Sequence, residues 1–267
     1  MKNKVRTDAP ITWCPGCTNF QILAGMQQFL EEQIKRGKKK EDFIMVAGIG
    51  CHAKIFDYFN MPGINTLHGR VPPTCLGIKL AKPYANVFGF SGDGDAYSEG
   101  LEHTISAARY NADFKYIIYN NQVFALTLGE PTQITELGFK DTTTPLGVNL
   151  HPLNPIKLLL ASGATFVARV FTEINQIKEI LKEALNHKGF AFIEIIQPCV
   201  VFHPDTGYKE RFYDLAKSGY DKTNLKAAME KAEEFDYSSK SAKIPLGIFY
   251  QISRPTFEEL KLNKKSN

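Results

Sequence analysis

Short apolar runs that alternate with helical patterns are the feature that most restricts how this chain can fold. Apolar residues recur at helical spacing over 18–36, 75–82, 98–110, 155–162 and 173–187. Five apolar runs predict strands buried on both faces, at 43–48, 86–92, 114–121, 165–170 and 190–196. Strands without a polar face, separated by helices, are typical of a parallel sheet covered on both sides. We therefore expect an α/β fold with an open, mainly parallel sheet flanked by helices.

The predicted domain covers residues 1–202. Residues 203–267 are more polar and lose the alternation. A chain of 267 residues is long enough for one large domain with an extension. We predict that 203–267 form a C-terminal extension or arm.

Charge and hydropathy limit the possible partners and compartment. The net charge of +4 comes largely from the clusters 35–40 and 261–265, which are typical of solvated helix ends rather than nucleic-acid patches. No run approaches the ~20 apolar residues of a membrane helix, and the N-terminus lacks the apolar core of a signal peptide. We therefore expect a cytoplasmic protein that binds neither nucleic acid nor membrane. Its five cysteines are then not expected to form disulfides.

Two polar motifs follow neighbouring predicted strands. Gly92-Asp93-Gly94 ends one apolar run, and Asn120-Asn121 ends the next. In an open parallel sheet, ligands bind outside the carboxyl ends of strands, so the two motifs are expected to meet. Glycines let the backbone approach a phosphate, and the Asp93 carboxylate and an Asn121 amide oxygen are ligands that suit Mg²⁺. Together the motifs predict a metal-bridged diphosphate site.

The spacing of these motifs makes the prediction more specific. Twenty-five residues (95–119) separate Gly94 from Asn120, which resembles the signature of thiamine-diphosphate enzymes. The simpler alternative is an ordinary Gly-Asp turn beside an unrelated asparagine pair. Asp95 completes an Asp-Gly-Asp sequence, which leaves a phosphatase or sugar-nucleotide site as a minor alternative.

The cysteines form one close pair and three singles. Cys14-x-x-Cys17 precedes every predicted strand, which weakens a thioredoxin-like interpretation. Structural zinc usually uses two close pairs, whereas an iron–sulfur cluster accepts dispersed thiolates. Cys51 and Cys199 follow predicted strands at the same sheet edge as Asp93, and Cys75 is explained as a small buried apolar residue. From the residues alone, an iron–sulfur cluster, a zinc site and unligated thiols all remain open.

Several motifs in order give the chain a family resemblance from about residue 10 to about residue 205. WCPGC, GIGC, HGR, GDGD and NNQV are similar to those of the β (thiamine-diphosphate-binding) subunit of 2-oxoacid:ferredoxin oxidoreductases. The resemblance implies that Cys14, Cys17, Cys51 and Cys199 hold a [4Fe-4S] cluster. It also implies that Mg²⁺ is bound by Asp93, Asn121 and the backbone carbonyl of Val123.

The resemblance further implies a thiamine diphosphate pocket and its contacts. The expected lining residues are Ile49, Gly50, Cys51, His52, His68, Gly92, Asp93, Gly94, Asp95, Asn121, Val123 and Leu126. Lys54 is a candidate partner for a substrate carboxylate, His68 for cofactor contact, and Leu126 for the pocket wall. A solvated lysine, a structural histidine and a core leucine are the respective alternatives. His52 stands where relatives commonly have serine, so the choice of 2-oxoacid stays open.

The activity implied is oxidative decarboxylation of a 2-oxoacid, such as pyruvate or 2-oxoglutarate, to acyl-coenzyme A and CO₂. Electrons would pass one at a time through the cluster to ferredoxin. Because we count one parallel sheet, the glutamate that activates thiamine is expected on an α subunit, or on α and γ subunits. The chain alone is therefore expected to be inactive. A subunit of a non-oxidative thiamine-diphosphate decarboxylase and a zinc-stapled nucleotide-binding module are the alternatives.

Overall fold

A mixed eight-stranded sheet forms the centre of the computed structural model, which describes residues 4–205 and 207–262. Its strands are β1 (Phe43–Ala47), β2 (Gly63–Asn65), β3 (Asn86–Gly92), β4 (Lys115–Asn120), β7 (Phe166–Phe171), β8 (Ala191–Ile196), β9 (Phe212–Asp214) and β10 (Ile244–Gln251). They lie in the order β2-β1-β3-β4-β8-β7-β10-β9. The first six are parallel, β10 runs antiparallel to β7, and β9 is parallel to β10. The predicted α/β class and all five predicted strands are confirmed.

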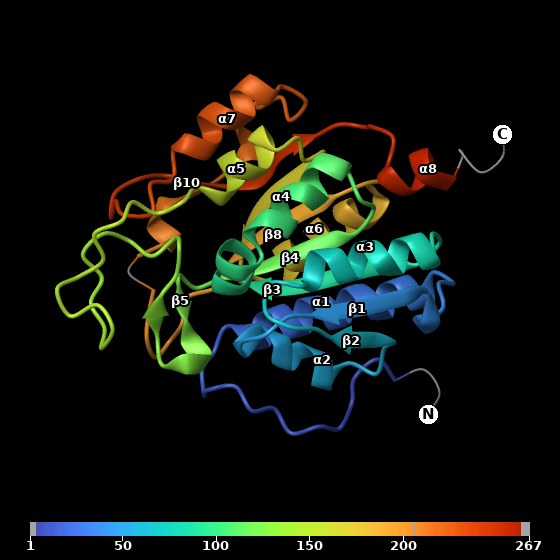
Figure 1. Cartoon of the computed structure of the whole chain (residues 1–267), viewed down its shortest axis with the longest axis horizontal. Coiled ribbons are helices and arrows are strands. Elements are labelled where there is room, and N and C mark those ends of the chain that lie inside the picture. Colours follow the sequence, from blue (N-terminus) through green and yellow to red (C-terminus); the bar gives the residue numbers. More distant parts are fainter. Residues whose placement is uncertain (1–3, 206, 263–267) are drawn as a thin grey trace.

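Helices cover both faces of the sheet (Figure 1). The helices are α1 (Asn19–Lys35), α2 (Ile55–Tyr58), α3 (Val71–Ala81), α4 (Leu101–Tyr110), α5 (Pro155–Ala161), α6 (Ile174–Asn186), α7 (Leu225–Glu233) and α8 (Phe257–Leu262). Buried residues of α1, α2 and α6 form one core layer, and those of α3, α4, α5 and α7 form the other. Strand β4 divides between them, because Tyr116 and Ile118 face one layer while Ile117 and Tyr119 face the other. This two-sided burial explains why the strands read as continuous apolar runs.

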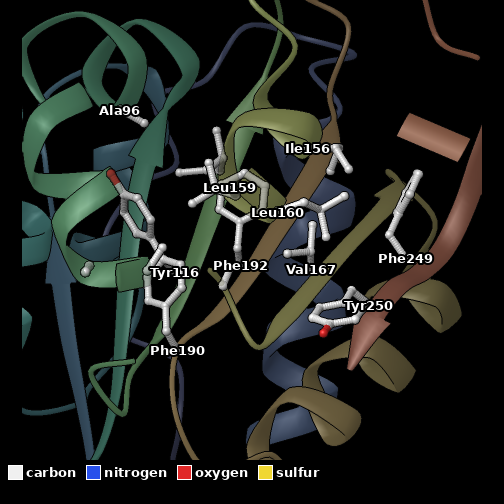
Figure 2. Close-up of a cluster of buried hydrophobic side chains, with 14 of the residues drawn as sticks. Ala96, Tyr116, Ile156, Leu159, Leu160, Val167, Phe190, Phe192, Phe249 and Tyr250 are labelled. Carbon is white, nitrogen blue, oxygen red and sulfur yellow. The ribbon is translucent and has the colours of Figure 1, made fainter. Parts of the chain in front are cut away.

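The C-terminal residues add two strands that the sequence did not predict. Pro245 and Gly247 lie within β10, and such residues are typical of strand edges and interruptions. Gly247 has φ +117° and the register with β7 shifts between Ile248 and Tyr250, so β10 is irregular. Figure 2 nevertheless shows its aromatic side chains in the same apolar cluster as Val167 of β7. The division of the chain at residue 202 stays a prediction, but part of 203–267 completes the central sheet.

The topology brings several loops to one edge of the sheet. Because β1, β3, β4 and β8 are parallel neighbours, their carboxyl ends lie on the same side. The segment between β4 and α5 includes a small hairpin of β5 (Val123–Phe124) and β6 (Glu130–Pro131). In Figure 1 this yellow-green segment extends beyond that edge. No helix among the described residues is both long and apolar enough to cross a membrane.

Candidate functional site

Asp93 and Asn121 meet at the carboxyl ends of β3 and β4. The backbone N–H of Asn121 donates to Asp93 Oδ1 at 3.2 Å, and the Thr132 hydroxyl donates to Asp93 Oδ2 at 2.6 Å. The Asn121 amide oxygen accepts from the backbone N–H of Val123 at 3.1 Å, which fixes the side-chain orientation. Asp93 and Asn121, which are 28 positions apart in the chain, are thus brought into contact because each follows the end of a neighbouring strand.

Burial governs the electrostatics of Asp93. Its side chain is 1% exposed, and this desolvation raises the pKa of Asp93 to about 7 although the bonds from Thr132 and Asn121 act in the opposite direction. In the described part of the chain, no lysine, arginine or histidine forms an ion pair with this carboxyl group. A divalent cation is the kind of group that would stabilise its charged form.

Asp95 is held between two histidines at the start of a π-helical turn, Asp95–Glu99. Its Oδ1 lies 2.9 Å from His68 Nδ1 and accepts from the backbone N–H of Gly69 at 2.7 Å. Its Oδ2 lies 3.7 Å from His52 Nε2. Burial by itself would raise the pKa of Asp95, but the contacts with His68 and His52 outweigh it and lower the pKa. Asp95 is thus an ionised group that orients His68, and π-helical turns of this kind are frequent at functional sites.

The two histidines differ in their surroundings. His52 is 4% exposed, and desolvation lowers its pKa to about 4, so the ring is neutral at pH 7. The close contact with the Asp95 carboxylate raises the pKa of the partly exposed His68, and Glu99 Oε2 lies 3.1 Å from the same Nδ1. With Nδ1 occupied by carboxylates, Nε2 is the nitrogen of His68 that can exchange protons with a ligand.

These groups line a cavity of about 120 Å³ that we call the acidic cavity, after Asp93 and Asp95. All twelve residues expected to line a cofactor pocket lie on its wall, although their roles stay predictions. Five residues that were not predicted from the sequence complete the lining: Tyr119, Phe124, Ala125, Thr127 and Gln197. Phe124 packs so closely on Gly94 that a Cβ there would lie 2.2 Å from the ring, so glycine is required.

Four of the five cysteines line a second cavity of about 50 Å³, which we call the cysteine cavity. They are Cys14, Cys17, Cys51 and Cys199, and all have free thiols. Cys75 lies instead in the core layer of α3 and is fully buried. Burial, followed by the nearby thiols of Cys199, Cys51 and Cys14, raises the pKa of Cys17 to about 11. The structure therefore gathers the four cysteines that the resemblance selected and leaves out the fifth.

Hydrogen bonds fix the segments that carry these thiols. The Trp13 indole N–H donates to the carbonyl oxygen of Cys51 at 2.7 Å, and the backbone N–H of Phe202 donates to Cys199 Sγ at 3.5 Å. Lys54 Nζ donates to the carbonyl oxygen of Thr12 at 3.1 Å. Lys54 therefore lines the cysteine cavity and not the acidic cavity where His68 and Leu126 lie. The structure does not place Lys54 in the acidic cavity, where the predicted contact with a substrate would be made.

The two cavities are neighbours. Cys51, Asn121, Ala125 and Gln197 line both of them. Within residues 4–205 and 207–262, no three His, Cys, Asp or Glu side chains are arranged to hold a single metal ion. An iron–sulfur cluster differs from such a site because its four thiolates bind different irons, and a Mg²⁺ site can use amide, carbonyl and diphosphate oxygens beside one carboxylate.

Comparisons with known proteins relate the chain to thiamine pyrophosphate enzymes and to 2-oxoacid oxidoreductases. Residues 48–195 match the family model of the C-terminal TPP-binding domain of thiamine pyrophosphate enzymes, and residues 200–264 match that of the C-terminal part of the β chain of pyruvate ferredoxin oxidoreductase. The 2-oxoacid:ferredoxin oxidoreductase subunit β of Saccharolobus solfataricus is 36% identical, over 95% of this chain and 86% of the relative. The 2-oxoglutarate oxidoreductase subunit KorB of Mycobacterium tuberculosis is 31% identical, over 95% of this chain and 78% of the relative.

A solved structure shares the complete fold. It is the 2-oxoglutarate:ferredoxin oxidoreductase from Magnetococcus marinus with 2-oxoglutarate, coenzyme A and succinyl-CoA bound. The TM-score is 0.91 at 30% identity, and the match covers 100% of this chain and 91% of that chain.

Proposed function

The chain belongs to the β-subunit family of the 2-oxoacid:ferredoxin oxidoreductases, and from this premise we propose how its two cavities serve oxidative decarboxylation of a 2-oxoacid. The acidic cavity would hold thiamine diphosphate with Mg²⁺, and the cysteine cavity would hold a [4Fe-4S] cluster. The single observation that carries the proposal is the shared wall, since four residues line both cavities. An electron acceptor beside the cofactor is what distinguishes this reaction from non-oxidative decarboxylation.

The residues of the acidic cavity suit a metal-bound diphosphate. Asp93 supplies a buried carboxylate that has no cationic side chain paired with it among the described residues. Asn121 supplies an amide oxygen whose direction is set by the N–H of Val123, and Val123 offers its carbonyl oxygen. One or two carboxylate or amide ligands plus diphosphate oxygens are usual for Mg²⁺. Thr132 keeps the Asp93 carboxylate in place.

The residues of the cysteine cavity fit an iron–sulfur cluster. Its four thiols are free and come from three separate segments, ending with Cys199 after β8. Desolvation raises the pKa of Cys17 and of Cys51, so a bound metal is needed to keep them as thiolates. Lys54 opposes this shift at Cys51, and we assign it to the electrostatics of the thiolate and not to substrate. The N–H of Phe202 donates to Cys199 Sγ, as amides commonly do at clusters.

The remaining residues of the acidic cavity bind and orient. When bound, thiamine diphosphate accepts the electron pair released as CO₂ leaves, and a cluster carries electrons onward singly. The Asp95 carboxylate orients His68 and leaves its Nε2 to hold a proton near the reacting groups. The half-exposed Leu126 provides an apolar wall for the substrate chain. Neutral His52 lines the cavity, and its ring lies against Gly50 and Gly92.

A partner chain completes the site. The described residues that line the acidic cavity include no glutamate, which thiamine activation requires in this family. Large apolar side chains on the walls of the two cavities are exposed, among them Ile49 and Leu126 in the acidic cavity and Val201 in the cysteine cavity. Exposed apolar surface of this kind is typical of a surface covered in an assembly. We assign the missing glutamate to an α subunit, or to α and γ subunits, with coenzyme A and ferredoxin as further partners in the cytoplasm.

Co-expression with the α subunit tests the proposal. The purified complex should be brown, contain about four irons per β chain, and reduce a one-electron dye with a 2-oxoacid only when coenzyme A is present. Pyruvate and 2-oxoglutarate are the first substrates to compare. The β chain alone should bind the cluster but show no turnover. A colourless complex that contains zinc, or turnover without coenzyme A and without a one-electron acceptor, would contradict the proposal.

A further inference from the structure

Gln197 is a buried side chain that lies on the wall between the two cavities. It directly follows β8 and precedes Pro198-Cys199, and only 2% of it is exposed. It lines both the acidic cavity and the cysteine cavity. Its backbone N–H donates to the carbonyl oxygen of Asn120 at 2.7 Å, which ties the end of β8 to the end of β4.

Both ends of the Gln197 amide form hydrogen bonds, one with Asn121 and the other with residues next to cysteines. Its Oε1 accepts from Asn121 Nδ2 at 3.2 Å. Its Nε2 donates to Thr18 Oγ1 at 2.9 Å and to the carbonyl oxygen of Pro198 at 3.2 Å. Thr18 directly follows Cys17, and Pro198 directly precedes Cys199. One side chain therefore joins Asn121 to two segments that carry cysteines.

The direction of the Gln197 amide is determined by its partners. A carbonyl oxygen only accepts, so the end that faces Pro198 must be the NH₂ group. The Asn121 oxygen is occupied by the N–H of Val123, so the end of Asn121 that faces Gln197 is its NH₂ group. This arrangement presents the Asn121 oxygen away from Gln197. An apolar replacement of Gln197 would leave Asn121 and Thr18 without these bonds, because an amide is needed to serve both.

The geometry points to Gln197 as a positioning residue that couples the two cofactor sites. A shift of Cys17 or Cys199 on cluster reduction would reach Asn121 through this amide, and binding of metal and diphosphate at Asn121 would reach the cysteines in return. Such coupling is reciprocal by thermodynamic linkage. This inference rests on the proposed function, because it requires that both cofactors bind.

The test compares Gln197→Met with the matched control Gln28→Met in the complex with the α subunit. Methionine has nearly the length of glutamine without its hydrogen bonds, and Gln28 is exposed on α1. Thiamine diphosphate affinity with Mg²⁺ is measured by calorimetry. The EPR spectrum of the dithionite-reduced cluster is recorded with and without thiamine diphosphate and Mg²⁺.

We expect Gln197→Met to retain its iron, to bind thiamine diphosphate about three- to tenfold more weakly, as the loss of one hydrogen bond implies, and to lose the cofactor-dependent change in the EPR spectrum. Gln28→Met should match the unmodified complex in all three measurements. The inference is overturned if Gln197→Met keeps both the affinity and the spectral change. It is also overturned if the unmodified complex binds both cofactors but its cluster spectrum does not respond to thiamine diphosphate.

A second variant covers the case in which Gln197→Met fails to assemble. Thr18→Val removes one bond to the Gln197 amide and leaves the bond to Asn121. It should reduce the spectral response while changing thiamine diphosphate affinity less than about twofold, and an unchanged response would reject the coupling. If the unmodified complex lacks iron or does not bind thiamine diphosphate, the proposed function itself is what fails.

Discussion

At the scale of single residues, Asp93 and Asp95 have opposite pKa shifts although only one glycine lies between them. Burial raises the pKa of Asp93, whereas the histidines around Asp95 lower the pKa of that residue below its ordinary value. A cation would stabilise the charged form of Asp93, whereas the carboxylate of Asp95 is already in contact with His68. One Gly-Asp-Gly-Asp turn thus carries both the proposed metal ligand, Asp93, and the carboxylate that contacts His68, and Phe124 packed on Gly94 holds the turn in place.

The opposite edge of the sheet carries a titratable residue whose effect is measurable. His187 is 7% exposed, its Nε2 lies 2.8 Å from Thr165 Oγ1, and Lys115 Nζ donates to its carbonyl oxygen at 2.7 Å. Desolvation, then the positive charge of Lys115, lowers the pKa of His187 to about 4, against a smaller opposing effect of Asp113. In the unfolded chain the pKa of His187 is near 6.5. As the pH falls, His187 is therefore protonated in the unfolded chain before it is protonated in the folded chain.

We predict that His187 destabilises the fold between about pH 6.5 and pH 4, by up to ~1.4 kcal/mol per pH unit. Above pH 6.5 the ring is neutral in both states and contributes no pH dependence. Urea unfolding of the chain from pH 7.5 to 4.5 measures this, with His187→Gln as the comparison. The glutamine NH₂ group can donate to Thr165 but does not titrate, so the variant should have the flatter profile. Parallel profiles for the two proteins would show that His187 does not titrate on unfolding.

Some residues of the site were predictable from the sequence and others were not. Side chains that directly follow a buried strand, such as Asp93 and Asn121, were predictable because topology fixes where strand ends lie. Gln197 follows β8 in the same way, and the same rule would have found it. Thr132 carries no such signal, because it reaches Asp93 from a loop 39 residues later in the chain. Selection of four cysteines out of five came from the family resemblance.

At the scale of secondary structure, close contact between two helices fixes the layer that includes α1 and α6. The predicted apolar face of α6 is confirmed at Ile177 and Leu181, which are buried against α1. Gly25 of α1 allows the contact, because a Cβ there would lie 2.8 Å from Ile177 Cγ2. The carbonyl oxygen of Ile174 would lie 3.2 Å away, so movement of the side chain alone would not relieve the crowding.

Two glycine-to-alanine replacements separate packing from helix propensity. Gly25→Ala should destabilise the chain by about 1–2 kcal/mol, because overpacking costs more than the gain in propensity. Gly77→Ala in α3 should stabilise it by about 0.5–1 kcal/mol, since an added Cβ meets nothing within 4 Å. Urea unfolding at constant m value gives both changes. Equal stabilisation by the two replacements would show that α1 and α6 are not in close contact at Gly25.

The long helices and the buried strands were predictable from the sequence, whereas the short and irregular strands were not. Strands buried on both faces and amphipathic helices have periodic signals, and these elements were placed within a few residues. β10 was missed because Pro245 and Gly247 interrupt its pattern, and its position depends on pairing with β7 and not on local preference. Short elements such as β2 and β9, of three residues each, carry too few side chains for any period to appear.

At the scale of the whole molecule, a buried ion pair joins the C-terminal residues to the site. Arg169 of β7 and Glu194 of β8 are fully buried, with Nε 2.6 Å from Oε2. The Tyr237 hydroxyl donates to Glu194 Oε1 at 3.1 Å and accepts from Arg169 at 3.1 Å. Glu194 Oε1 also accepts from Asn120 Nδ2 at 2.8 Å, directly before Asn121. The C-terminal residues therefore satisfy charges that lie behind the acidic cavity.

Truncation tests whether residues 203–267 are an arm or part of the core. A chain that ends at residue 202 loses β10, which exposes the edge of β7 and removes Phe235 and Phe249, both almost fully buried. Arg169 would keep its ion pair with Glu194 but lose Tyr237 and the aromatic rings it lies over, and a buried donor left without its partner costs about 1–3 kcal/mol.

We expect the 1–202 chain to be aggregated or loosely packed, with strong binding of an apolar dye and no near-ultraviolet circular dichroism. A chain that ends at Leu262 keeps every described element and is the control, with a cooperative urea transition. If the 1–202 chain shows the same near-ultraviolet spectrum and a cooperative transition, then the boundary at residue 202 separates an autonomous domain from an arm. The ion pair of Arg169 with Glu194 would then be stable without Tyr237, contrary to the cost of leaving buried charges incompletely paired.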